Sequence, residues 1–221
     1  QRSRPGTVIK KHEGIIDDEI EYELVIDYLV LLETEERYTK TIEKAVRQFP
    51  IWQHFLKDVK GCGPIMAAVI ISELDPHKAR HVSSFWKYAG LDVVDGEGRS
   101  RKKNHLVDIE YVNKDGELAT RKSITFNPFL KTKLIGVLGP SFLKSKSPYS
   151  NIFYDYRNRL ENHPVHKEKT AGHRKNMSIR YMIKMFLKDL WVAWRTLEGL
   201  PVTPDYAEAK LGMKHGEEIK Q

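Results

Sequence analysis

Two glycines on either side of a cysteine form the first feature of this sequence that could bind a ligand. The segment 60–64 reads Lys-Gly-Cys-Gly-Pro and has apolar residues on both sides. Glycines permit a tight turn and a close backbone approach, and Pro64 suits the first turn of a following helix. The unpaired amides and positive end of such a helix attract phosphate. The pattern predicts a helix-hairpin-helix that contacts a nucleic-acid backbone through Lys60, Gly61 and Gly63. The alternative is a tight helix–helix turn without a ligand.

A second candidate is a loop that places one serine among basic residues. Ser100 is the only serine of segment 95–103, and four cations surround it: Arg99, Arg101, Lys102 and Lys103. Arginine and lysine can bind a phosphate and stabilise the negative charge that develops when it is attacked. These residue types predict a basic loop that contacts nucleic acid.

Cysteine and histidine chemistry is limited in this chain. Cys62 is the only cysteine among 221 residues, which excludes a disulfide framework and a cysteine-based zinc site. It fits the apolar position of the glycine turn, so we expect a small buried residue and not a nucleophile. His163, His166 and His173 match no common metal-ligand spacing, so no metal site is predicted. His173, Arg174 and Lys175 begin a predicted helix, where they either contact phosphate or form a solvated cap.

The charge is unevenly distributed along the sequence. The whole chain has a net charge of +7, yet 10 acidic residues and no Lys or Arg lie between Glu13 and Glu36. The remainder therefore carries +17, and residues 121–195 hold 16 Lys or Arg against 4 Asp or Glu. A basic block of this strength favours a polyanionic partner, nucleic acid being the commonest inside cells. The alternative is a solvated basic surface.

The elements that must position these residues are mainly helical. Periodic apolar residues predict one long helix over 15–49, which Pro50 ends, and a helical unit over 51–75 interrupted by the glycine turn. We expect Ser83 or Ser84 to cap a short helix that ends near Tyr88. Further helices are predicted over 127–138, 149–162 and 173–197. Two strands on either side of Asp115-Gly116 predict a β-hairpin over 107–112 and 117–125.

This reading divides the chain into three parts. Residues 1–49 form an N-terminal arm and long acidic helix, residues 50–200 a helix-hairpin-helix domain, and residues 201–221 a polar tail. No apolar run is long enough for a membrane span, and the start of the chain lacks an initiator Met and an apolar signal core. We therefore expect a cytoplasmic, nucleoid-associated protein with no membrane partner. The start of the chain indicates a fragment or a processed product.

Several blocks, in this order, resemble the C-terminal transposase domain of the IS110/IS116 insertion-sequence family, also called bridge-RNA-guided serine recombinases. The glycine turn is followed by Phe-Trp-Lys-Tyr-Ala-Gly-Leu at 85–91 and by the serine-bearing basic loop. Asn-Pro-Phe-Leu-Lys then stands at 127–131, and Gly-His-Arg-Lys at 172–175 opens a helix that runs past Trp191. The resemblance covers about residues 50–198, and the long helix before it looks like the family's coiled-coil segment.

The resemblance implies DNA strand exchange during transposition of a mobile element. It makes Ser100 the candidate nucleophile. A serine needs charge neutralisation and a base to attack a phosphodiester, and His105 is the nearest candidate base. The alternative is that Ser100 sits in a basic loop that only contacts nucleic acid. The resemblance also implies a separate ribonuclease-H-like domain whose acidic residues hold Mg²⁺. We therefore expect that this chain binds no cofactor and is inactive alone. The expected partners are DNA, a guide RNA, and a second copy of the chain through the N-terminal helix. The alternative function is a non-catalytic helix-hairpin-helix module that binds DNA or RNA.

Overall fold

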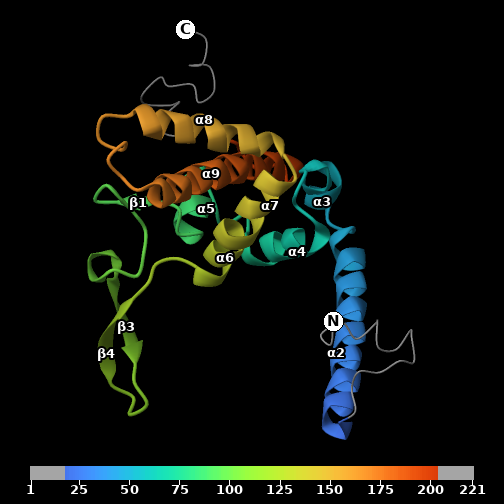
Figure 1. The fold of residues 1–221 in the computed structure, drawn as a ribbon. Coiled ribbons are helices and arrows are strands. Elements are labelled where there is room, and N and C mark those ends of the chain that lie inside the picture. The colour runs from blue at the N-terminus through green and yellow to red at the C-terminus, as the bar shows by residue number, and fades with distance from the viewer. Residues whose placement is uncertain (1–17, 204–221) are drawn as a thin grey trace.

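The computed structural model describes residues 18–203, and the N-terminal arm before Asp18 and most of the predicted polar tail lie outside this range. The fold is mainly helical, as predicted, with a long first helix and two small antiparallel hairpins (Figure 1). Within the described range no helix is long and apolar enough to cross a membrane.

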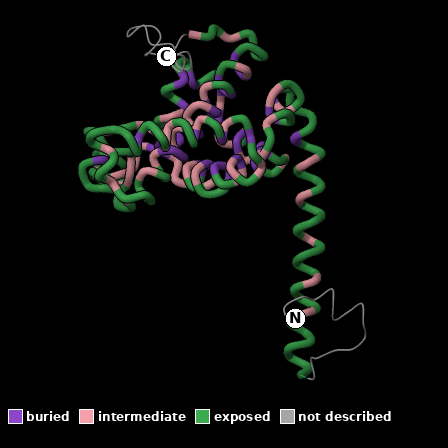
Figure 2. The backbone as a smooth tube through the Cα atoms, turned by 45° about the horizontal axis from the view of Figure 1, so that its top comes forward, coloured by how far each residue is buried: buried purple, intermediate pink, exposed green. Residues whose placement is uncertain are grey.

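Helix α2 (Glu19–Val46) confirms the long acidic helix within the described range. The Asp18 side chain accepts a hydrogen bond from the Glu21 amide at 3.0 Å, which caps the first turn. Most of α2 is exposed and stands away from the remaining helices (Figure 2), and only Val46, its last residue, reaches the core.

Two short helical segments and the glycine turn lead from α2 to α4. Helix α3 (Pro50–His54) begins at a proline and is followed by the 3₁₀-helix η1 (Leu56–Asp58) and then by α4 (Pro64–Glu73). Helix α5 (Val82–Tyr88) follows, with His81 before its first residue and no side-chain cap. The predicted capping by Ser83 or Ser84 is therefore wrong: α5 starts at Val82, two to three residues earlier than such a cap implies, because the buried Val82 already belongs to its packed face.

Two hairpins interrupt the helices. Strands β3 (Val107–Val112) and β4 (Leu118–Ser123) pair antiparallel and form the hairpin that was predicted over 107–112 and 117–125. Val112 lies opposite Leu118. Strands β1 (Val93–Val94) and β2 (Glu97–Gly98) form a second, smaller hairpin inside the segment expected to be a loop. This hairpin was not predicted because two-residue strands leave no alternation to detect.

The predicted helix over 127–138 starts as expected and ends later. The Asn127 side chain accepts from the Leu130 amide at 3.0 Å and caps α6 (Pro128–Thr132). The chain then widens into a π-helical segment, η3 (Lys133–Leu138), and continues as α7 (Gly139–Lys144). Gly139-Pro140 does not stop the helix, because proline falls in the first turn of α7, where its missing amide costs little.

Helices α8 (Pro148–Asn162) and α9 (Ala171–Leu197) form an antiparallel pair that completes the core (Figure 1). Thr170 caps α9 through the His173 amide at 3.2 Å. The apolar face predicted for this helix is buried throughout: Ile179, Met182, Ile183, Phe186, Leu190 and Trp194. Near its C-terminal end, the Trp191 indole donates to the Ala79 carbonyl at 2.8 Å, which ties α9 to the segment before α5. Helix α9 is therefore the element against which the functional loops are placed.

Candidate functional site

The β1–β2 hairpin fixes the position of the serine-bearing loop. Its two connecting residues, Asp95 and Gly96, have φ values of 50° and 76°. Positive φ at both positions is the geometry of a two-residue hairpin turn, which aspartate and glycine favour. The turn sends the chain back, so that the Arg99 amide donates to the Asp92 carbonyl at 3.0 Å. Ser100 is thus held one residue beyond a closed hairpin.

An ion pair closes this loop from the side. Arg99 Nη2 lies 2.7 Å from Asp92 Oδ2, and Arg99 Nε also donates to the same carboxylate. Both side chains are mostly buried, with exposed fractions of 12% and 22%. The hydrogen bond that Arg99 donates to Asp92 raises the pKa of Arg99. Arg99 Nη1 also donates to the His105 carbonyl at 3.3 Å, so this guanidinium is committed to the loop itself.

Ser100 faces a buried histidine across the loop. The Ser100 amide donates to His105 Nδ1 at 3.0 Å, and Ser100 Oγ lies 3.0 Å from the same nitrogen. His105 ends the 3₁₀-helix η2 (Lys103–His105) and has an exposed fraction of 1%. Ser100 is partly buried. The sequence named both residues, but their contact depends on the turn of η2.

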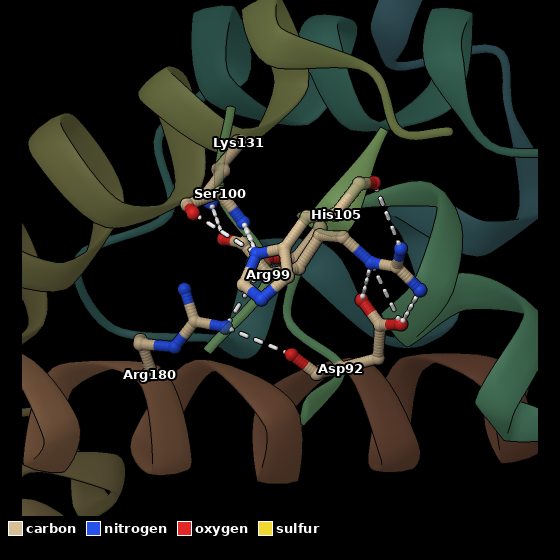
Figure 3. A network of polar contacts seen from close by, with 7 residues as sticks. Asp92, Arg99, Ser100, His105, Lys131 and Arg180 are labelled. Carbon is tan, nitrogen blue, oxygen red and sulfur yellow. Dashed lines mark hydrogen bonds and ion pairs between the residues drawn. The ribbon is translucent and has the colours of Figure 1, made fainter. Parts of the chain in front are cut away.

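Two cations from distant helices complete the cluster (Figure 3). Lys131 of α6 donates to the Arg99 carbonyl at 2.5 Å, and Arg180 of α9 donates to the Gly90 and Asp92 carbonyls at 3.2 Å. Burial, together with the nearby Arg180 charge, lowers the pKa of Lys131 to about 8. Burial also lowers the pKa of Arg180. Half-buried positive charges of this kind favour an anion, because a bound anion offsets the loss of hydration.

Gly98 allows the Arg180 guanidinium to lie against the hairpin. A Cβ at position 98 would be 2.9 Å from Arg180 Cζ, which is closer than real Cβ atoms come to other atoms. Neither Arg180 nor Asp92 was selected from the sequence as a site residue. Arg180 falls within the longest apolar-faced helix and Asp92 next to a buried leucine, so no local pattern marks them. Lys131 was noticed only as part of the Asn-Pro-Phe-Leu-Lys block.

The other predicted basic residues of the loop lie at its surface. Lys102 pairs with Glu97 at 2.5 Å, and both side chains are more than half exposed. This hydrogen bond and charge lower the pKa of Glu97. Arg101 and Lys103 are exposed. The loop therefore turns Arg99 inward and presents Arg101, Lys102 and Lys103 outward.

The glycine turn lies elsewhere, between η1 and α4, and its two glycines have different surroundings. Gly61 has φ +94°, and a Cβ there would be 2.6 Å from Ser145 Oγ. The Ser141 hydroxyl of α7 also donates to the Gly61 carbonyl at 2.7 Å. Gly61 is therefore required by packing on α7. Gly63 is exposed, with no atom within 4 Å of an added Cβ.

The start of α4 retains features of an anion site. Gly63 precedes its first residue without any side-chain cap, and Lys60 is exposed next to the turn. Cys62, between the glycines, is buried, and desolvation raises the pKa of its thiol to about 12. The thiol therefore stays protonated near neutral pH, which agrees with the expected small buried residue and not with a nucleophile.

His173, Arg174 and Lys175 at the start of α9 were predicted either to contact phosphate or to form a solvated cap, and the structure gives Arg174 a different position from the other two. Arg174 donates to the carbonyls of Lys167 and Lys169 and so braces the α8–α9 connection. His173 and Lys175 are exposed. Among residues 18–203, no group of three or more His, Cys, Asp or Glu side chains could hold a metal ion.

Comparison with known proteins identifies the class of this domain. Residues 53–107 match a sequence model of one family of transposases. That family is described as Transposase IS116/IS110/IS902, and the match supports the resemblance found in the sequence. The matched segment contains Gly61, Gly63, Ser100 and His105 and ends at the first residue of β3. Searches of curated proteins and of solved structures gave no match.

The family match confirms the resemblance found in the sequence and gives this domain a transposase-type function. It also makes DNA the expected partner. The roles of the individual residues, the helix-hairpin-helix contact with DNA and the assembly of the chain stay predictions.

Proposed function

We propose that this domain is the DNA-binding, serine-bearing part of a DNA transposase, and that Ser100 attacks the scissile phosphodiester. The observation that carries the proposal is the position of Ser100. Ser100 is partly buried within the family-matched segment, and Lys131, Arg101 and Arg180 lie around the loop. A hydroxyl among fixed cations is suited to attack a phosphate whose negative charge grows during reaction.

The step is a transesterification that conserves bond energy. A bond forms between Ser100 Oγ and phosphorus, and the bond from phosphorus to one deoxyribose oxygen breaks. The serine proton passes to a base, and the departing oxygen takes up a proton. In the second step, the corresponding deoxyribose hydroxyl of another strand attacks the phosphorus of the serine phosphoester. This attack reverses the bond changes, frees the serine and joins the new strand. Strand exchange therefore needs no external energy source.

Binding of the duplex is assigned to exposed groups outside the reactive loop. The uncapped start of α4 at Gly63, with Lys60 beside it, offers backbone amides and a charge to a phosphate. His173 and Lys175 at the start of α9 add further exposed positive or titratable groups. Such contacts hold DNA without reading its sequence. Lys60→Met should therefore weaken binding to all duplexes alike and reduce the salt slope by about one unit.

The domain is proposed to act only with the Mg²⁺-binding domain of the complete enzyme, in the cytoplasm and on nucleoid DNA. A guide RNA and self-association through α2 belong to the same proposal. The 221-residue chain should bind DNA without cutting it. Cleavage by this chain alone in the presence of Mg²⁺ would contradict that dependence.

The test of the proposal is Ser100→Ala in the complete transposase. Strand exchange should be lost while DNA binding changes little, because the hydroxyl is the reacting group and carries no charge. Ser83→Ala, at an exposed serine on α5, is the matched control and should retain full activity. Wild-type strand exchange in Ser100→Ala would exclude Ser100 from the reaction and favour the alternative, a non-catalytic DNA-binding module.

A further inference from the structure

One ring nitrogen of His105 makes two contacts with Ser100. Both the amide nitrogen and the hydroxyl oxygen of Ser100 lie 3.0 Å from His105 Nδ1 (Figure 3). A backbone N–H can only donate, so the Nδ1 atom that accepts from it must carry a lone pair. The same nitrogen then cannot donate to Ser100 Oγ. The hydroxyl must be the donor in the second contact, which aligns its proton with the histidine lone pair.

The histidine is held in this orientation from several sides. Its backbone carbonyl accepts from Arg99 Nη1, and its ring has almost no exposed surface. The second ring nitrogen, Nε2, is buried and has no hydrogen-bond partner among the described residues. With Nδ1 unprotonated, Nε2 carries the proton of the neutral ring. The His105 ring thus makes its polar contacts through Nδ1 alone among the described residues, and both of these contacts are with Ser100.

We propose that His105 is the base that takes the proton of Ser100 when the hydroxyl attacks phosphorus. This inference rests on the proposed function, and it names the group that activates the nucleophile. As the bond between Oγ and phosphorus forms, the hydroxyl proton moves onto Nδ1 across a donor–acceptor distance of 3.0 Å, and the leaving group departs from phosphorus. The imidazolium that results lies beside the phosphoryl group, whose negative charge is greatest in the transition state. No oxidant or further reactant is involved.

A competing explanation is that His105 only braces the loop through the Ser100 amide. An asparagine separates the two roles, because its side-chain oxygen can accept from that amide yet takes up no proton near neutral pH. His105→Asn should therefore retain the loop and lose proton transfer. His54→Asn, at an exposed histidine at the end of α3, is the matched control.

The experiment uses the 221-residue chain and a fluorophosphonate, a phosphorus electrophile that reports on activated serines. In the reaction, Ser100 Oγ bonds to phosphorus, fluoride leaves, and the proton goes to His105. Mass spectrometry of the Ser100 peptide measures the rate of labelling at several pH values. The wild-type chain and His54→Asn should label at Ser100, and His105→Asn should label about 100-fold more slowly, within the usual range for a general base.

The pH dependence supplies a readout that a brace would not change. Acid that protonates the His105 ring should slow the wild-type reaction, since a protonated Nδ1 cannot accept another proton. The charged groups of the loop and of the cluster around it include Asp92, Glu97, Arg99, Lys131 and Arg180. None of them is changed in His105→Asn, so this acidic limb should disappear in that variant if His105 causes it.

Two results would overturn the inference. One is labelling of Ser100 in His105→Asn at the wild-type rate with the same pH profile. The other is absence of preferential labelling at Ser100 in the folded wild-type chain. Failure here is distinct from failure of the proposed function. If Ser100→Ala abolishes strand exchange but His105→Asn labels normally, Ser100 is still the nucleophile and another group is its base.

Discussion

The Asp92 carboxylate and the Arg99 guanidinium form a two-pronged ion pair that closes the loop carrying Ser100, with Nη2 2.7 Å from Oδ2. The same guanidinium holds the His105 carbonyl. The Asp92–Arg99 ion pair at the start of the β1–β2 hairpin therefore holds both partners of the Ser100–His105 contact, because Arg99 precedes Ser100 in the chain and binds the backbone of His105. Arg99, which the sequence alone predicts to bind DNA, thus also holds the loop in place.

Asp92→Asn should leave this guanidinium partly buried without its counter-charge. We expect a loss of about 1–3 kcal/mol in the free energy of unfolding, and a slower reaction of Ser100 with the fluorophosphonate, because the loop loses its closure. Asp108→Asn is the control, since its pair with Lys122 is more than half exposed on both sides. That change should cost less than about 1 kcal/mol. Equal effects of the two changes on urea unfolding would contradict the structural role of the Asp92–Arg99 pair.

Lys131 should make DNA binding depend on pH. Its pKa of about 8 lies well below the ordinary value for lysine because the side chain is half-buried and near other cations. The group loses its charge as the pH rises through 8, so affinity should fall by about tenfold between about pH 7 and about pH 9, the effect of losing one charged hydrogen bond. The arginine in Lys131→Arg keeps its charge over this range, so the affinity of this variant for DNA should stay constant. Fluorescence anisotropy with a labelled duplex measures both. An identical pH dependence in the two proteins would exclude Lys131 from the interface.

The two glycines of the turn should respond differently to substitution. Gly61→Ala forces a side chain into a left-handed backbone conformation and against Ser145, so it should lower the free energy of unfolding by about 1–3 kcal/mol. Gly63→Ala meets no neighbouring atom and should change stability by less than about 0.5 kcal/mol. It should nevertheless weaken duplex binding, because the added methyl group keeps a phosphate away from the start of α4. Normal DNA affinity in a stable Gly63→Ala protein would remove this turn from the interface.

The strongest sequence signals in this chain are helical periodicity and turn chemistry, and the structure agrees where they are strong. The apolar face of α9, the long α2 and the β3–β4 hairpin all follow from spacing within one segment. The β1–β2 hairpin is too short for such a pattern. The helix also continues through a π-helical segment to the end of α7, which the Gly139-Pro140 sequence does not predict.

The candidate site was predictable only in part, for a different reason. Ser100, His105 and the basic loop are close in sequence, so their types and spacing were informative. Lys131 and Arg180 reach the loop from helices that lie far along the chain, and only tertiary packing brings them there. Arg99 was identified as a cation, but sequence could not show that Asp92 holds it inside the loop.

The central claim is that Ser100 becomes covalently joined to DNA, and trapping that bond tests it most directly. The complete transposase would be incubated with a nicked duplex whose short cleaved strand diffuses away, so that the joined state accumulates. After denaturation and digestion, mass spectrometry locates the attached nucleotide. We expect it on the peptide that contains Ser100, and none in the Ser100→Ala protein. Cleavage without any covalent protein–DNA product, or a product attached at another residue, would contradict the account.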